Sequence, residues 1–279
     1  MEARRLVQRQ RASLVTKPAR ARSRAGRAAH VLAVVFSDRE RQRKLDDFFV
    51  LKRGETEALT GNNDSQIDAG MKCDKDLIPS GHSGKVIRSI RKQWEAVKIV
   101  TFNVESLRGN RTQELIAAQE QRKVDIGIWV GTRSNYNGDS NVGEFKLFHE
   151  ANGNGGTEWM TGLVISIRKS LLVRQSIVKK WTAMEGRILL VRIKNIAIDV
   201  TICAAYAPGD HLSRELRGRF WDNLRKAFRE LPNRTTKVVG IDANGHTGRD
   251  GIGGIGKNGQ ERWTNNGHEL EKMVNEGRI

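Results

Sequence analysis

Four polar residues stand at or just after the ends of apolar, β-branched runs. They are Asn103 in the run TFNV, Tyr206 in AYAP, and Asp242 and Asn244 in GIDANGHTG. Burying a polar side chain inside such a run costs free energy unless the side chain is hydrogen-bonded or has a role in binding or catalysis. A carboxylate can hold a metal ion or accept a proton, and a neighbouring amide can orient a phosphate oxygen or a water. These residue types are therefore candidates for chemistry at a phosphate group.

Each of these residues also has a purely structural interpretation. Asn103 can be a satisfied amide at the end of a strand, and Tyr206 can bury its ring while its hydroxyl stays hydrated. Asp242 and Asn244 can form an Asx turn that leads into the glycine-rich loop behind them. Because residues i and i+2 of a strand share one face, Asp242 and Asn244 are expected to point into the same cavity. Both interpretations stay open for each residue.

The runs that carry these residues predict strands with helices inserted between them. Strands are expected at 98–104, 124–130, 145–149, 162–168, 173–179, 187–193, 196–206 and 237–241. Helices are expected at 111–123 and 214–231, with a third starting near residue 267. Only Lys194-Asn195 separates two of the strands, which is a hairpin signal and predicts an antiparallel pair. The pattern favours layered α/β architecture with mixed or antiparallel sheets over a doubly wound parallel sheet.

The two longer helices have recognisable starts and apolar faces. Asn110, with Gln113 three residues later, predicts the start of the first, and Ser213 is expected to cap the second. Spacings of three and four place one set of apolar side chains on the inward face of each helix. These sets are Leu115, Ile116 and Ala118 in the first helix, and Leu216, Phe220, Leu224, Phe228 and Leu231 in the second.

Charge and hydropathy divide the chain of 279 residues into two parts. The net charge is +17, and residues 1–30 alone hold nine Lys or Arg against a single acid. Polyanions are the natural partners of such a chain, because each neutralised phosphate releases counterions. Residues 1–96 have little apolar periodicity and are expected to form a basic, disordered leader, with order beginning at Val97. Residues 97–279 are expected to form the folded domain.

Several classes of protein are disfavoured by the sequence. Two cysteines, Cys73 and Cys203, make neither a disulfide framework nor a zinc cluster, which fits a reducing compartment. No stretch approaches the roughly 20 apolar residues that span a bilayer, so no membrane partner is expected. The first 30 residues superficially match an organellar transit peptide, an alternative to the unstructured leader. Nothing in the sequence indicates the oligomeric state.

The ordered set of motifs resembles the endonuclease/exonuclease/phosphatase superfamily. The set is Thr-Phe-Asn-Val, a helix, a strand leading to Gly-Thr-Arg, then Tyr-Ala-Pro and Asp-x-Asn-x-His-Thr-Gly, and it covers residues 97–276. The motif sequences are similar to those of the endonuclease domain of LINE-type, non-LTR retrotransposons, a group that includes the craniofacial development protein 2-like proteins. The resemblance implies a four-layer α/β sandwich, with two mixed, largely antiparallel sheets packed face to face and helices outside.

The resemblance also implies an activity, which is hydrolysis of phosphodiesters in DNA or RNA with Mg²⁺, or Mn²⁺ in its place, and a nuclear location. Carried over by motif, Asn103 and Asp242 would organise the metal, and Tyr206 would contact the scissile phosphate. Asp242 would also position or activate the attacking water, and Asn244 would bind a phosphate oxygen.

Three further residues are candidates for contacts with nucleic acid. Arg187 matches the family's Gly-Arg strand start and has a structural role as its alternative. Arg133 belongs to the Gly-Thr-Arg motif. His246 matches the His or Arg that commonly follows the family's Asp-x-Asn-x motif.

Two departures from the family predict weak or absent activity. Gly131 in Trp129-Val-Gly-Thr-Arg133 occupies the position of a metal-binding Glu, and a glycine supplies no carboxylate. The family's last strands, with an Asp and a Ser-Asp-His, have no counterpart before Ile279, so the domain is expected to be C-terminally truncated. Two other functions stay open: a non-catalytic basic nucleic-acid-binding protein, and a phosphatase acting on a small or lipid phosphate, which the basic charge disfavours.

Overall fold

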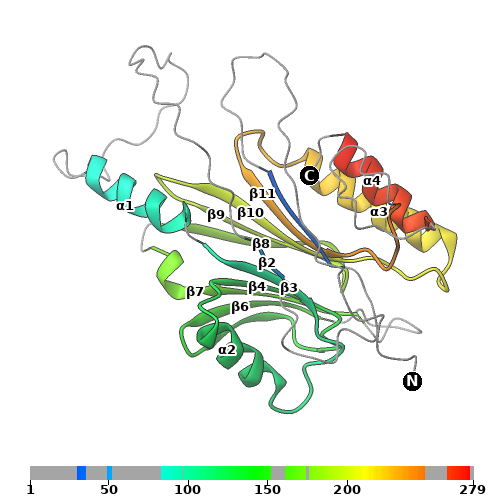
Figure 1. Cartoon of the computed structure of the whole chain (residues 1–279), viewed down its shortest axis with the longest axis horizontal. Coiled ribbons are helices and arrows are strands. Elements are labelled where there is room, and N and C mark those ends of the chain that lie inside the picture. The colour runs from blue at the N-terminus through cyan, green and yellow to red at the C-terminus, as the bar shows by residue number, and fades with distance from the viewer. Residues whose placement is uncertain are drawn as a thin grey trace, which may run out of the picture.

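A computed structural model describes residues 30–35, 49–51, 83–95, 97–151, 161–173, 176–248 and 263–276. Within this part of the chain, two β-sheets lie face to face between outer helices (Figure 1). One sheet has five strands in the order β1-β11-β10-β9-β8, and the other has six in the order β2-β3-β4-β7-β6-β5. None of the helices in the described ranges is long and apolar enough to cross a membrane.

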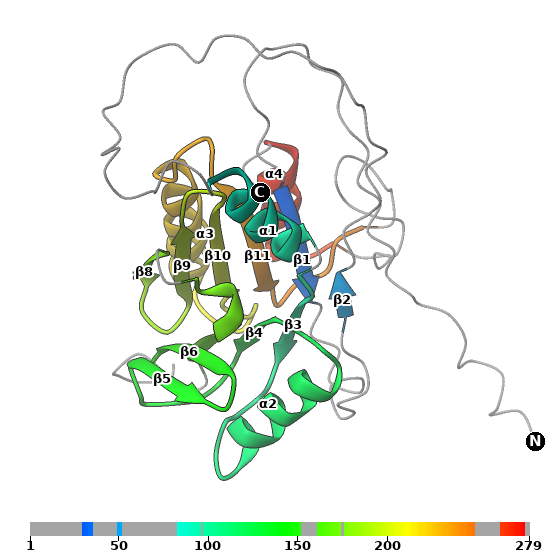
Figure 2. The same cartoon turned by 90° about the vertical axis from the view of Figure 1, so that its left-hand side faces the viewer.

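The five-stranded sheet mixes parallel and antiparallel pairs. Its strands are β1 (His30–Val35), β11 (Thr236–Asp242), β10 (Asp199–Tyr206), β9 (Ile188–Lys194) and β8 (Ile177–Met184). β1 and β10 run parallel to β11, whereas β9 runs antiparallel to both β10 and β8. Figure 2 shows β1 beside β11 at the edge of this sheet.

The predicted hairpin between β9 and β10 is present, but its turn was predicted wrongly. Four residues, 195–198, separate the strands instead of two. The Asn195 side chain explains the wider turn, because its Oδ1 accepts hydrogen bonds from the backbone N–H groups of Ala197 (2.9 Å) and Ile198 (3.0 Å). An asparagine that bonds the backbone two and three residues later stabilises a wider loop than the two-residue signal suggests.

The six-stranded sheet has one parallel pair, β3 with β4, and its other neighbours are antiparallel. Its strands are β2 (Phe49–Leu51), β3 (Ile99–Asn103), β4 (Ile126–Val130), β7 (Leu163–Arg168), β6 (Phe145–Glu150) and β5 (Gly138–Val142). β5 was not predicted, because its sequence GDSNV lacks apolar alternation and it forms by pairing with β6. The expected fold class, with two mixed and largely antiparallel sheets, is confirmed.

Three apolar clusters hold the layers together. The central cluster lies between the sheets and includes Ile128, Val191 and Ile202. α3 (Arg214–Arg229) and α4 (Asn265–Asn275) cover the outer face of the five-stranded sheet, and α2 (Arg111–Gln121) covers that of the six-stranded sheet (Figure 1). Helix, sheet, sheet and helix therefore form the expected four-layer α/β sandwich.

The observed starts of α2 and α3 agree with the predicted ones, whereas only one of the two cap residues makes a side-chain capping bond. Ser213 caps α3 as predicted, since its side chain accepts a hydrogen bond from Leu216 N at 3.2 Å. Asn110 occupies the cap position of α2, but its side chain makes no capping bond. Gln119 is buried in place of the expected Ala118, because its Oε1 accepts a hydrogen bond from Ser166 Oγ at 2.7 Å.

Regular structure begins before Val97, so the expectation that order starts there is wrong. β1, β2 and α1 (Ser83–Glu95) all lie within residues 1–96. β1 forms because its sequence HVLAVV is an apolar, β-branched run that pairs with β11. α1 has helical apolar spacing that its polar neighbourhood obscured, and it buries Ile90 and packs Trp94 against the central cluster. The division of the chain into a leader of residues 1–96 and a folded domain of residues 97–279 stays a prediction.

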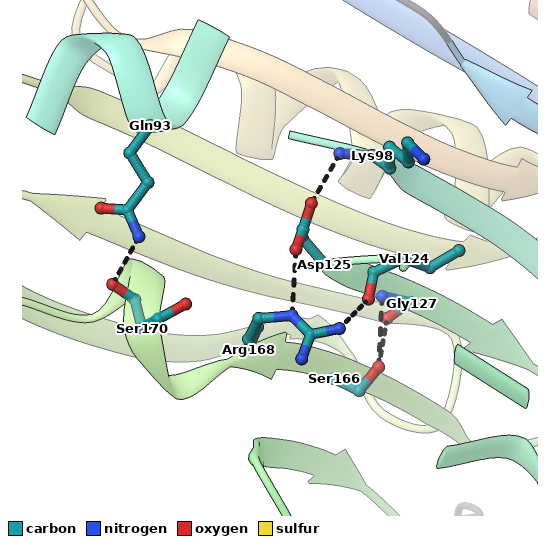
Figure 3. A network of polar contacts seen from close by, with 8 residues as sticks. All are labelled: Gln93, Lys98, Val124, Asp125, Gly127, Ser166, Arg168 and Ser170. Atoms are coloured by element: carbon teal, nitrogen blue, oxygen red, sulfur yellow. Dashed lines mark hydrogen bonds and ion pairs between the residues drawn. The ribbon is translucent and has the colours of Figure 1, made fainter. Parts of the chain in front are cut away.

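A polar network closes the end of the sandwich at which β4 starts and β7 ends (Figure 3). Asp125 accepts hydrogen bonds from Lys98 N and Arg168 Nε, both at 3.0 Å, and Arg168 Nη2 donates to the Val124 carbonyl at 3.0 Å. Gln93 on α1 donates to the Ser170 carbonyl at 2.9 Å. The carboxyl ends of the parallel strands β3 and β4 lie at the opposite rim. The carboxyl ends of β10 and β11 lie at the same rim, because Asn103 at the end of β3 donates a hydrogen bond to Asp242 at the end of β11.

Candidate functional site

The ends of three strands bring the predicted polar residues together at this opposite rim. Tyr206 and Asp242 are register partners at the ends of the parallel strands β10 and β11. Asn103 ends β3 in the facing sheet, and its Nδ2 donates a hydrogen bond to Asp242 Oδ2 at 2.8 Å. Asn244 follows β11, and its Nδ2 donates to the Ala207 carbonyl at 2.7 Å. Both sheets therefore contribute to one cluster, as the motif order predicted.

Two Asx turns set the geometry of this cluster. Asp242 Oδ1 accepts a hydrogen bond from Asn244 N at 2.9 Å, and Asn103 Oδ1 accepts one from Glu105 N at 3.1 Å. Asn244 (φ 45°) and Glu105 (φ 55°) both have left-handed backbone, which bends the chain sharply after each strand. The structural interpretation of Asp242 and Asn244 is therefore correct, and the turns also hold both side chains at the rim.

Tyr206 lies half-buried between the two asparagines. Burial raises the pKa of its phenol, and the charge of Asp242 raises it further. Hydrogen bonds with the Asn103 and Asn244 side chains and the charge of Arg187 oppose this rise in pKa without cancelling it. The hydroxyl therefore keeps its proton at neutral pH and can donate a hydrogen bond to an acceptor such as a phosphate oxygen.

Asp242 is fully buried, and its environment disfavours the ionised form. Burial raises the pKa of the carboxyl from its ordinary 3.8 to about 6, although hydrogen bonds from Asn244 N and the Asn103 side chain favour the charged form. A carboxylate with a pKa near neutrality is suited to accept a proton. The cluster can therefore combine a proton acceptor with amide and hydroxyl donors.

Gly131 packs directly against this cluster. Its φ is +67°, and a Cβ at this position would lie 2.6 Å from Asn103 Oδ1. The Asn103 amide thus occupies the space that a side chain at residue 131 would need. The absence of a side chain at Gly131 therefore lets Asn103 reach Asp242.

The residues present do not fit a preformed Mg²⁺ site. Asp242 is the one carboxylate of the four site residues, and both of its oxygens accept hydrogen bonds. Glu150 ends β6 on the same rim, but its carboxylate is bonded to Thr182 Oγ1 and Gly186 N. Among the described residues, no three His, Cys, Asp or Glu side chains are grouped so that they could hold a metal ion. Mg²⁺ requires carboxylate oxygens that are free to coordinate.

The predicted nucleic-acid contacts take different positions around the cluster. Arg187 is 3% exposed, and its Nη1 donates to the Tyr206 carbonyl at 3.2 Å, so burial favours its structural role. Arg133 is partly exposed at the start of the loop after β4, where its N–H donates to the Thr161 carbonyl at 2.7 Å. His246 N donates to Thr264 Oγ1 at 2.9 Å, which ties the site loop to the start of α4.

Sequence reasoning missed Asn266, which supports the site from α4. This side chain is 1% exposed. Its Oδ1 accepts a hydrogen bond from Trp221 Nε1 at 2.9 Å, and its Nδ2 donates to the carbonyls of Pro208 (2.7 Å) and Asn244 (3.4 Å). One amide thus joins α3, the turn after Tyr206 and the Asn244 turn. Its partners are 22 to 58 residues away in sequence, so no local pattern signals it.

Replacing Asn266 with alanine is expected to lower the free energy of unfolding by about 2–6 kcal/mol. Two buried groups, Trp221 Nε1 and the Pro208 carbonyl, would lose their partner, at about 1–3 kcal/mol each. Urea denaturation followed by tryptophan fluorescence measures this change. Asn275→Ala is the matched control, because Asn275 is exposed at the end of the same helix. A loss below about 1 kcal/mol would show that water replaces these hydrogen bonds.

No family model and no curated protein matches this chain. Among solved structures, the chain is similar to the endonuclease domain of TRAS1, a telomere-specific non-LTR retrotransposon, with a TM-score of 0.45 and 14% identity over 64% of this chain and 70% of that one. It is also similar to an endonuclease/exonuclease/phosphatase family protein from Leptotrichia buccalis, with a TM-score of 0.40 and 13% identity over 54% and 67% of the two chains. A third is the AP endonuclease LMAP from Leishmania major, with a TM-score of 0.40 and 17% identity over 48% of each chain.

These solved structures include the kinds of protein that the sequence motifs resemble. The matches span between 48% and 70% of the solved chains. At identities of 13–17%, the likeness does not carry activities or substrates over to this chain. The function of the rim is therefore interpreted from its own residues.

Proposed function

We propose that this chain is a nucleic-acid-binding domain of the nuclease type, in which the rim of Asn103, Tyr206, Asp242 and Asn244 faces a phosphodiester and hydrolysis is weak or absent. The convergence of these four side chains from both sheets supports the proposal most directly. The Tyr206 hydroxyl and the two amides provide donors for phosphate oxygens, and Asp242 provides a proton acceptor beside them.

The charge of the chain supports a polyanionic partner. The net charge is +17, so a phosphodiester backbone gains from releasing its counterions on binding. Arg187, the guanidinium whose charge acts on Tyr206, is buried and donates to the Tyr206 carbonyl, so it adds little to the exposed charge of the rim. Charge therefore brings the nucleic acid to the protein, and the polar rim positions one phosphodiester.

The proposal of weak or absent hydrolysis rests on the donor set around Asp242. A divalent ion would have to be held by Asp242 and Asn103, whose oxygens already accept hydrogen bonds, and Gly131 adds no carboxylate. Such an ion would supply charge neutralisation at the phosphate when bound. Without tight metal binding, Asp242 can accept a proton from water, but the negative charge that develops on the phosphate is left poorly stabilised.

Fluorescence anisotropy with a labelled DNA duplex tests the binding part of the proposal. Asn244→Ala is expected to weaken binding about tenfold, the equivalent of one hydrogen bond to a charged group. Asn195→Ala is the matched control, because Asn195 also supports a turn but lies at the opposite end of the sandwich. Equal affinities for both variants and a steep salt dependence would instead indicate the alternative, a non-catalytic basic nucleic-acid-binding protein that uses charge alone.

A nicking assay tests the hydrolysis part. Supercoiled plasmid incubated with the full chain and Mg²⁺ is expected to stay intact or to be nicked slowly. The Asp242→Asn variant is the negative control. Rapid nicking by the wild type that disappears in Asp242→Asn would overturn the proposal of weak activity. Comparing turnover of inositol phosphates in the same experiment tests the phosphatase alternative.

A further inference from the structure

An exposed aromatic residue lies on the loop that begins at Gly131. Among the described residues, the large apolar side chains with high exposure are Val86, Tyr136, Ile177 and Ile196, and Tyr136 is the aromatic one, at 49% exposed. The loop leaves β4 beside Asn103, and its backbone bonds to Gly162 and Thr161 at the start of β7. It then enters β5, so Tyr136 belongs to the same rim as the site.

Contacts on three sides hold Tyr136 in place. Its hydroxyl donates to the Asp139 carbonyl at 2.8 Å, and its N–H donates to Ser134 Oγ at 3.1 Å. The ring makes a T-shaped contact with the ring of His149, with centroids 4.9 Å apart and planes at 77°. Gly138 allows this pose, because its φ is +149° and a Cβ there would lie 3.0 Å from the phenol oxygen. The ring is therefore fixed even though half of it is exposed.

The support under the ring is itself rigid. His149 is buried and shares a hydrogen bond with Ser140 Oγ at 2.8 Å. Burial, and next the charge of Lys180, lower the pKa of His149 to about 4, so the imidazole is neutral at physiological pH. Lys180 reaches across from β8 and donates to Asn137 Oδ1 at 3.0 Å and to the His149 carbonyl. The loop is thus joined to both sheets.

The strand register places this aromatic at a definite distance from the phosphate rim. Asn103, Val130, Leu163 and Glu150 are successive register partners across β3, β4, β7 and β6, and Gly138 is paired with the adjacent His149. Four strand steps of about 4.8 Å separate β3 from β5, or roughly 19 Å in total. A strand of nucleic acid bound at Asn103 and Asp242 could therefore reach Tyr136 a few nucleotides away.

We infer that Tyr136 is a stacking platform for a nucleobase, so that this rim binds single-stranded nucleic acid or an unpaired base beside the bound phosphodiester. The inference rests on the proposed nucleic-acid binding and adds the nucleobase as a second recognised group. A fixed aromatic ring loses little entropy when a base stacks on it, and such stacking tolerates any base because each has a π-face. Arg133 on the same loop adds a positive charge for the backbone of that strand.

The experiment compares two labelled strands of equal length and charge, one of oligothymidylate and one of abasic deoxyribose phosphate. The wild-type chain is expected to bind oligothymidylate more tightly. Tyr136→Ala should lose about tenfold in affinity for oligothymidylate and none for the abasic strand, whereas Tyr136→Phe should keep most of the preference. Ile177→Ala is the matched control, because Ile177 is 67% exposed at the opposite end of the sandwich.

The outcomes separate this inference from the proposed function. Equal wild-type affinities for the two strands that Tyr136→Ala leaves unchanged would overturn base stacking while nucleic-acid binding stands. Failure of the wild type to bind either strand would overturn both. If Tyr136→Ala does not fold, photocrosslinking of the wild type to a strand containing 5-iodouracil decides: an adduct on Tyr136 supports the platform, and adducts only elsewhere overturn it.

Discussion

Between about pH 4 and pH 8, the free energy of unfolding of the wild-type chain is expected to fall by about 3 kcal/mol relative to that of Asp242→Asn. The reason is the rise in the pKa of Asp242 from its ordinary 3.8 in the unfolded chain to about 6 in the native fold. Within this interval the native state holds a proton that the unfolded state has released. The contribution of Asp242 to stability is therefore fully present near pH 4 and is lost as the pH rises through about 6.

The measurement is a series of urea denaturations of both proteins across this range. Taking the difference between the two curves cancels every other titrating group, provided that both proteins unfold in two states. Asp242→Asn keeps an oxygen for Asn244 N but presents an N–H₂ group to the Asn103 N–H₂ group, so its absolute stability can shift in either direction. The pH dependence of the difference carries the test, and parallel curves would contradict the buried, proton-binding carboxyl.

Asp199 offers a control of opposite sign. Burial alone would raise its pKa, but hydrogen bonds with Arg192 and Thr235 and the charges of Arg192 and Arg234 outweigh that effect and lower it. A carboxyl with a lowered pKa contributes stability above its ordinary pKa and loses it as the pH falls. The free energy of unfolding of the wild type relative to Asp199→Asn should therefore rise with pH, whereas that relative to Asp242→Asn falls.

Much of the sandwich could be predicted because its strands are apolar runs with sharp ends. β3, β4, β7, β9, β10 and β11 all coincide with such runs, and α3 has both a capping serine and a regular apolar face. β5 could not be predicted, because a polar strand at a sheet edge takes its conformation from its partner. α1 and β1 were missed because composition over a long window concealed short periodic segments.

The candidate site was predictable to the extent that it consists of strand ends. Asn103, Tyr206 and Asp242 interrupt apolar runs, and each ends its strand in the fold. Their convergence across two sheets followed from the resemblance of the motif order and not from any local pattern. Asn266 and Tyr136 carry no such signal, because the role of each depends on partners that only the tertiary structure brings near.

Gly131→Ala is expected to destabilise the fold by about 2–5 kcal/mol. Left-handed backbone costs a residue with a Cβ about 1–2 kcal/mol, and φ at Gly131 is +67°. The new Cβ would also displace the Asn103 amide, which lies 2.6 Å from its position, and thereby remove a hydrogen bond to the buried Asp242. Leaving that carboxylate oxygen without its donor adds about 1–3 kcal/mol.

Gly109→Ala separates these two contributions, because Gly109 has the same φ of +67° but a Cβ there would meet no other atom within 4 Å. Its loss should be limited to the backbone cost of about 1–2 kcal/mol, and nucleic-acid affinity should be unchanged. A larger loss for Gly131→Ala, together with weaker nucleic-acid binding, would tie stability and function to the same Asn103–Asp242 contact. If the two alanine variants unfold at the same urea concentration, Asn103 moves aside freely, and the glycine is needed for its backbone angle alone.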